Sequence, residues 1–336
     1  MADLPAGFTG RRVRPDDDVG DILDLLNAVA VADYGVADVD ERMVRAAYAL
    51  PAFHPETDSW VVHDAAGRLA GLVDHYDGDE LHVAPYVFLR VRPDLAGTPL
   101  TDALLAHELE RAHETVDLAP ADARVALRTD VASVNAPVIA ALERSGWRRD
   151  RTNWVMEIDL VAAAPIPAPE WPDGITVRSA DLERDARAIH AADLDAFSDH
   201  YGFVPQPYEE WLHFRTEFVR AEPDLWFLAM DGEEIAGIAI CASERRGQPD
   251  LGWVSILGVR RPWRRRGIAL ALLRHAFREL AARGKSRAGL GVDAESLTGA
   301  TRLYERAGMR VVREGYEYER VIRDGRELRT VELTAG

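Results

Sequence analysis

The stretch RRPWRRRGIALALL, residues 260–273, joins a dense run of positive charge to an apolar segment. Five of its first seven residues are arginines, and Gly267 separates them from apolar residues that recur with helical spacing. The preceding residues, 253–259, have the composition of a buried strand. The first N–H groups of a helix have no partner within it, and the helix dipole adds partial positive charge there. A strand, a basic turn and a helix therefore predict an anion site around Gly267, where a phosphate can approach the backbone closely.

The neighbouring motifs narrow the kind of anion site. The chain contains neither GxxxxGK[ST] nor GxGxxG. Residues 264–269 instead resemble the R/Q-x-x-G-x-G/A pyrophosphate loop of the GCN5-related N-acetyltransferase (GNAT) family. Residues 299–309, GATRLYERAGM, resemble that family's A-x-x-L-Y-x-x-x-G-F motif, with Met309 in place of the phenylalanine. Both motifs in this order make nearly the whole second half of the chain similar to a GNAT domain.

The sequence also repeats itself. Residues 60–74 match residues 226–240, residues 88–105 match 256–273, and residues 134–147 match 297–309, at shifts of 166, 168 and 162 positions. VRP at 13–15 has a counterpart in VRS at 177–179. Four ordered matches predict a tandem duplication with domains at 1–161 and 175–336. The segment between them, 162–174, holds four of the 18 prolines and predicts a stiff, exposed linker.

Composition limits the class of protein. The 336 residues include 40 Lys+Arg and 57 Asp+Glu, so the formal net charge is −17, which disfavours nucleic acid as a partner. No apolar run is long enough to span a membrane, and the first residues lack the apolar core of a signal peptide, so a cytoplasmic location is predicted. The single cysteine, Cys241, excludes an intrachain disulfide and a cysteine metal cluster, and we expect no metal.

The GNAT resemblance implies a fold and a cosubstrate. The fold would be α/β (α+β), with two tandem GNAT folds, each a mixed, mostly antiparallel sheet flanked by helices. Acetyl-CoA would be the cosubstrate, with its pantetheine arm along the backbone of Leu257, Gly258 and Val259. The N–H near Leu257 would stabilise the oxyanion, and Tyr304 would protonate the departing thiolate. The pyrophosphate would lie on Arg264, Arg265, Arg266, Gly267, Ile268 and Ala269.

The acceptor side is less defined. In the family a helix–loop region lines the acceptor pocket, and here the corresponding segment is rich in acidic and aromatic residues, which favours a cationic amine. The strand at 253–259 offers no carboxylate as a general base. An asparagine that many members carry before the last helix is replaced here by Ser296 or Leu297. The candidate acceptor residues are Asp195, Asp199, His200, Tyr201 and Glu209.

The predicted activity is acetyl transfer from acetyl-CoA to a primary amine of a small molecule by direct attack on the thioester, in the second half of a monomer or homodimer. A mycothiol-synthase-like acetyltransferase is one alternative, and a CoA-binding sensor without turnover is another.

The first half is expected to be catalytically silent and to bind CoA poorly. At the shift of 168, Ala96, Pro99 and Thr101 stand opposite Arg264, Gly267 and Ala269, and Pro99 has no N–H to offer a phosphate. Leu142 stands opposite Tyr304.

Overall fold

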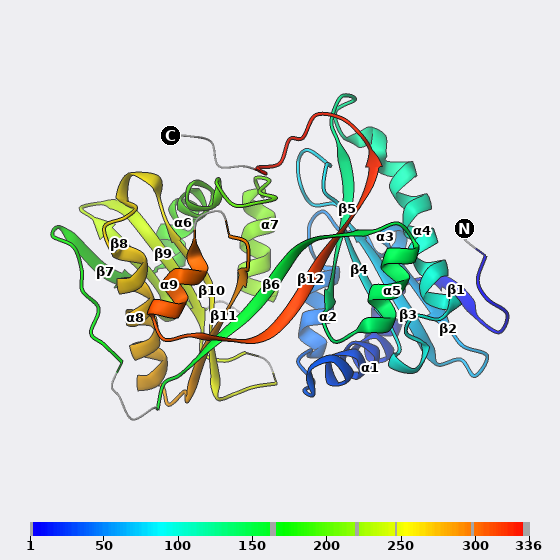
Figure 1. The fold of residues 1–336 in the computed structure, drawn as a ribbon, viewed down its shortest axis with the longest axis horizontal. Helices are drawn as coiled ribbons and strands as arrows, with labels where there is room; N and C mark the ends of the chain where they lie inside the picture. Colours follow the sequence, from blue (N-terminus) through cyan, green and yellow to red (C-terminus); the bar gives the residue numbers. More distant parts are fainter. Residues whose placement is uncertain (1–2, 162–165, 219–221, 246, 297–298, 332–336) are drawn as a thin grey trace. The chain divides into compact units, whose positions relative to one another are not determined.

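The structure is a computed structural model that describes residues 3–161, 166–218, 222–245, 247–296 and 299–331 (Figure 1). The chain forms two compact units. The first comprises Met1–Thr152 and Gly315–Arg329, and the second comprises Asn153–Glu314 and Thr330–Gly336. Within the described ranges, no helix has the length and apolar character needed to cross a membrane.

The first unit is a sheet with helices on both faces. Its strand order is β1-β2-β3-β4-β5-β12, and all neighbours are antiparallel except β4 and β5. The strands are β1 (Thr9–Arg12), β2 (Ser59–His63), β3 (Leu69–Tyr76), β4 (Tyr86–Val91), β5 (Val125–Ala132) and the second part of β12 (Arg310–Arg323). The helices are α1 (Pro15–Tyr34), α2 (Glu41–Tyr48), α3 (Pro55–Asp58), α4 (Pro99–Thr115) and α5 (Ala136–Arg144).

Alternation along the strands builds a core on each face of this sheet. Val62 and Val73 pack in one cluster with Leu104 of α4, whereas their neighbours Val61 and Leu72 pack in the other cluster with α1. Because successive side chains of a strand point to opposite faces, a sheet covered on both sides reads as a continuous apolar run. This arrangement explains the nearly uninterrupted burial of β2 and β3.

The second unit has the same architecture. Its strand order is β7-β8-β9-β10-β11-β6, and β10 and β11 form its parallel pair. The strands are β7 (Ile175–Ser179), β8 (Trp226–Asp231), β9 (Glu234–Ala242), β10 (Leu251–Val259), β11 (Arg287–Asp293) and the second part of β6 (Arg148–Asp159). Helix α8 (Ile268–Ala282) covers one face with α9 (Ala300–Arg306), and α6 (Leu182–Phe197) with α7 (Tyr208–His213) covers the other. The predicted mixed, mostly antiparallel fold is therefore confirmed, and it occurs twice.

One repeated contact corrects an alignment made from the sequence. Arg11 binds Asp18 through two hydrogen bonds of 2.6 Å, and Arg178 binds Asp185 through bonds of 2.6 and 3.0 Å. Each aspartate also accepts the backbone N–H four residues before it. The two pairs correspond at a shift of 167 positions, so the match of VRP with VRS was wrong by three residues. The residues that flank VRP and VRS have similar composition, but the buried aspartates, Asp18 and Asp185, show which positions of the two units correspond.

The units differ from the predicted ranges at two strands. Residues Asn153–Asp159 of β6 lie in the predicted first domain, 1–161, but pair with β11 of the second unit. Residues Gly315–Arg323 of β12 lie in the predicted second domain, 175–336, but pair with β5 of the first unit. Each sheet is thus completed by a strand that the other half of the sequence encodes.

Candidate functional site

Strand β10 separates from its parallel partner halfway along its length. It pairs with β11 only from Leu251 to Val254, and a β-bulge at Ser255 interrupts its pairing with β9. Beyond Val254, within the described residues, β10 has no strand partner on the β11 side. At Gly291 of β11, a side chain would meet nothing within 4 Å. The backbone from Ser255 to Val259 therefore has one edge with no strand partner among the described residues, where an extended ligand can hydrogen-bond, although the Val259 carbonyl already accepts from Arg264.

The basic turn after β10 has an unusual backbone. A short 3₁₀ turn (Arg261–Trp263) is followed by Arg265 with φ +63° and Gly267 with φ +91°. Gly267 caps α8 without a side-chain hydrogen bond. In the described part of the chain, nothing accepts a hydrogen bond from the N–H groups of Arg265, Gly267, Ile268, Ala269 or Leu270. The turn therefore presents a cluster of free donors at the positive end of a helix, which is the arrangement that binds phosphate.

The arginines of this turn divide into two groups. Arg264 donates to the carbonyl oxygens of Val259 and Ala196, each at 3.1 Å, and to the Asp199 carboxylate. Arg261 also binds Asp199, and Arg260 binds Asp195 at 2.6 Å. Arg265 and Arg266 are exposed, and the one hydrogen bond of their side chains among the described residues joins Arg266 to the Asp173 carbonyl at 3.2 Å. Arg266 also forms an ion pair with Asp231 at 3.8 Å. Three arginines thus anchor the turn, and Arg265 is the exposed one with no side-chain partner among the described residues.

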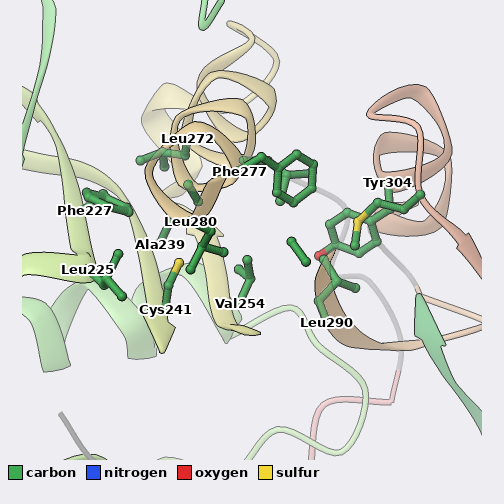
Figure 2. Packing of buried hydrophobic residues seen from close by; sticks show 14 of the residues in the cluster. Leu225, Phe227, Ala239, Cys241, Val254, Leu272, Phe277, Leu280, Leu290 and Tyr304 are labelled. Atoms are coloured by element: carbon green, nitrogen blue, oxygen red, sulfur yellow. The ribbon is translucent and has the colours of Figure 1, made fainter. Parts of the chain in front are cut away.

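Tyr304 lies on α9, with its ring in the core of the second unit. Figure 2 shows it reaching toward Leu290 of β11. Only 7% of the residue is exposed, and burial raises the pKa of Tyr304 to about 12. No hydrogen bond to its hydroxyl is present among the described residues. The phenol is neutral at physiological pH and holds a proton that it can donate.

A strand from the first half of the sequence supports this helix. Met156 of β6 is fully buried in the same core cluster as Tyr304, and Ile158 lies 3.3 Å from the position of a Cβ at Gly308. This contribution of β6 could not be predicted from the sequence, because a strand's own pattern does not show which sheet the strand joins.

The structure brings some acceptor candidates together and separates others. Asp195 and Asp199 both meet the basic turn through its arginines. His200 lies next to them, and its burial and the nearby Arg264 charge lower its pKa. Tyr201 is half-buried in the same loop. Glu209 is exposed in the first turn of α7, with no ion pair among the described residues.

The position of the family's asparagine falls partly outside the described residues. Leu297 lies outside the described residues. Ser296 closes a turn, with its N–H donating to the Asp293 carbonyl at 3.1 Å.

The corresponding turn of the first unit is closed. The Gly97 N–H donates to Thr101 Oγ1 at 3.0 Å, and the Thr98 N–H donates to the Leu95 carbonyl at 3.2 Å. Pro99 is the first residue of α4 and has no N–H. The Pro137 carbonyl of α5 lies 2.7 Å from the position of a Cβ at Gly97, so no ligand can reach the turn there.

Comparisons with a protein family and with individual relatives both find acetyltransferases. Residues 187–309 match the acetyltransferase (GNAT) family. The chain is 31% identical over 245 residues to a mycothiol acetyltransferase of Thermobispora bispora, covering 69% of this chain and 78% of the relative. It is 32% identical over 301 residues to a mycothiol acetyltransferase of Salinispora arenicola, covering 87% and 89%.

Solved structures extend the likeness to the whole chain. A GCN5-related N-acetyltransferase from Sphaerobacter thermophilus is 34% identical, with a TM-score of 0.77 over 97% of this chain and 99% of that one. A tandem GNAT protein from the clavulanic acid biosynthesis pathway is 17% identical, with a TM-score of 0.70 over 94% and 99%. The second likeness concerns the fold alone, and it is a likeness to a tandem arrangement.

Proposed function

This chain belongs to the GNAT family of acetyl-CoA-dependent N-acetyltransferases, and we propose that its second unit transfers the acetyl group to a primary amine of a small molecule. The observation that carries the proposal is the cluster of free N–H groups at the start of α8, beside the open edge of β10. In the first unit the N–H groups of Gly97, Thr98 and Thr101 are already bonded and Pro99 has none, and no tyrosine stands at the position that corresponds to Tyr304.

The residues of the second unit fit acetyl-CoA. The N–H groups around Gly267 would hold the pyrophosphate, with charge from Arg265 and Arg266. Arg264 would act indirectly, because its guanidinium is already bound to Val259, Ala196 and Asp199. The edge of β10 from Leu257 to Val259, which lacks a strand partner, would pair with the amide groups of the pantetheine arm through the backbone groups that Arg264 does not already bind.

The chemistry requires few protein groups. The neutral amine nitrogen attacks the thioester carbon, and the carbonyl oxygen takes up negative charge that the N–H near Leu257 would stabilise. The C–S bond then breaks, and the sulfur takes the Tyr304 proton. The amine loses its own proton to solvent or to a base. A thiol of ordinary pKa near 8.5 is a fair leaving group, so this proton donation assists a step that is already feasible.

A panel of amines tests this activity through release of free thiol from acetyl-CoA. We expect turnover with cationic small-molecule amines, because Asp195, Glu209 and their neighbours make the α6–α7 segment acidic. The acceptor of mycothiol acetyltransferase belongs in the panel, since relatives of that name cover most of this chain. A panel that stays silent while CoA binds would favour the sensor. A preference for anionic acceptors would contradict the assignment of this segment to a cationic acceptor. We further expect a cytoplasmic monomer or homodimer.

Two glycines of α8 provide a matched test of the cofactor site. Gly267 and Gly284 flank the helix, with φ of +91° and +78°, and at both positions a side chain would meet nothing within 4 Å. Alanine at either position costs similar backbone strain, about 1–2 kcal/mol. Gly267→Ala should weaken CoA binding at least tenfold in calorimetric titration, because a side chain would stand where the phosphate approaches. Gly284→Ala should bind CoA normally. Equal affinity in both variants would contradict the proposed site.

A further inference from the structure

We infer that Asp199 is a positioning residue of the cofactor turn rather than a contact of the acceptor amine. This inference rests on the proposed function, because it assigns Asp199 to the acetyl-CoA side of the same site. It assigns Asp199 a different role from the one its sequence position suggests, since the residue lies in the loop that follows α6.

The Asp199 carboxylate is already occupied. One oxygen accepts from Arg261 Nε at 3.1 Å and from Arg264, and the other accepts from a second Arg261 nitrogen. The side chain is 7% exposed. These two guanidinium groups hold the pKa of Asp199 below its ordinary value, so the group stays ionised. A buried carboxylate with two arginine partners has little capacity left for an incoming ammonium group.

Arg264 carries this anchoring to the site itself. Besides Asp199, it binds the carbonyl of Val259 at the end of β10 and the carbonyl of Ala196 at the end of α6. At Gly258, a Cβ would lie 2.9 Å from Ala196 and 2.9 Å from the Phe197 ring, so the end of α6 packs directly against the strand backbone. Asp199 therefore fixes the guanidinium that joins the helix, the strand and the turn.

The backbone of the turn needs such an anchor. Arg265 follows Arg264 and has φ +63°, a left-handed conformation that is strained for a residue with a side chain. Strained conformations persist where the surroundings hold them. Asp199 is itself held from the other side, because Thr330 Oγ1 donates to the Ser198 carbonyl at 3.0 Å and the Gly202 N–H donates to the Thr330 carbonyl at 2.7 Å. The contacts form a chain of support from Thr330 to the strained residue.

The first unit lacks both sides of this interaction. At the shift of 167 that relates the two Arg–Asp pairs, Ala32 stands opposite Asp199. At the shift of 168, Pro93 and Ala96 stand opposite Arg261 and Arg264. The unit whose turn has free donors is the unit that keeps the acid and both arginines.

The test compares Asp199→Asn with Asp224→Asn. Asp224 also binds an arginine, Arg283 at 2.6 Å, at the far end of α8. For Asp199→Asn we expect the Kd of CoA in calorimetric titration and the KM of acetyl-CoA to rise about tenfold, since hydrogen bonds between charged groups are lost. The KM of the acceptor and kcat should change less than twofold. Asp224→Asn should match the wild type.

A second variant guards against misfolding. Arg261 is half-exposed, and Arg261→Gln should raise the Kd of CoA in the same direction. In the double variant the effect should not exceed that of Asp199→Asn alone, because both groups act through one contact. A raised acceptor KM with unchanged CoA affinity, or tighter CoA binding by Asp199→Asn, would overturn the assignment. A wild-type protein that binds no CoA would instead contradict the proposed function.

Discussion

The two turns that follow β4 and β10 take the same path and differ in what they leave free. Each begins with a 3₁₀ turn, Pro93–Leu95 or Arg261–Trp263, and each then has a residue of positive φ, Gly97 or Arg265. The first turn binds a donor of its own within the turn, because Thr101 Oγ1 accepts a hydrogen bond from the Gly97 N–H. At the position of Thr101 the second unit has Ala269, whose methyl group accepts nothing.

A single backbone angle separates the turns at the helix start. Gly267 adopts φ +91° and α8 begins after it, whereas Pro99 cannot adopt positive φ and α4 begins with it. The first unit therefore keeps the strand, turn and helix while the N–H groups of Gly97, Thr98 and Thr101 are bonded and Pro99 has none. The comparison teaches that the strand, turn and helix can be kept without the anion site, and that Pro99 and Thr101 close the first turn where Gly267 and Ala269 leave the second one open.

The strands beside the turns show the same contrast. Thr129 of β5 donates from its hydroxyl to the Val87 carbonyl of β4 at 2.7 Å, which bridges the parallel strands where they would otherwise separate. In the second unit the corresponding residue, at the shift of 162, is Gly291, and no side chain bridges β11 to β10 there. A hydroxyl closes one sheet at the place where a glycine leaves the other open.

The largest effect should come from Tyr304, because the first unit has Leu142 at the corresponding position. Tyr304→Phe removes the proton donor but keeps the ring, so kcat should fall about 100-fold or more while the Kd of CoA stays unchanged. Tyr318→Phe is the matched control, because it removes a phenol hydroxyl in the first unit, where Tyr318 binds Glu143 at 3.0 Å. Unchanged turnover in Tyr304→Phe would mean that the thiolate leaves unaided.

The next largest effect should come from Arg264 and Arg265, which belong to the two groups of arginines and support CoA binding for different reasons. Both Arg265→Ala and Arg264→Ala should raise the KM of acetyl-CoA about tenfold, the first by losing a phosphate contact and the second by releasing the turn. Ionic strength separates these causes. Only Arg265→Ala should weaken the salt dependence of CoA binding, because exposed charges are screened by salt. Affinity unchanged in both variants would mean that the arginine run is solvated surface.

A smaller effect concerns pH. Burial raises the pKa of Tyr304 to about 12, so the phenol keeps its proton until the pH approaches that value. The rate kcat/KM should therefore show no loss attributable to Tyr304 between pH 7 and 10, and Tyr304→Phe should leave the shape of the profile unchanged in this range. A decline with an apparent pKa near 10 that the variant abolishes would contradict the burial of the hydroxyl.

The smallest expected effect is none at all. Pro99→Gly restores a backbone N–H and allows positive φ in the first unit. The Thr101 hydroxyl oxygen still accepts the Gly97 N–H, and position 96 is an alanine rather than an arginine. Calorimetric titration should find no second CoA site in this variant. A second site would show that the proline alone silences the first turn.

The fold was predictable where local sequence decides it. The strand expected at 253–259 and the helix expected after Gly267 agree with β10 and α8, because apolar periodicity and Gly267 mark them in the sequence. The partners of β6 and β12 were not predictable, since a strand's own pattern does not select its neighbour. The Asp199 contacts with Arg261 and Arg264 were likewise hidden, because they join residues more than 60 positions apart.

The stoichiometry of CoA binding tests the central contrast most directly. We predict that calorimetric titration of the full chain with acetyl-CoA gives one strong site per chain, and that Gly267→Pro abolishes it by removing the donor and the positive φ together. Two tight sites in the unmodified protein, or one site that survives Gly267→Pro, would contradict the assignment of acetyl-CoA to the second unit.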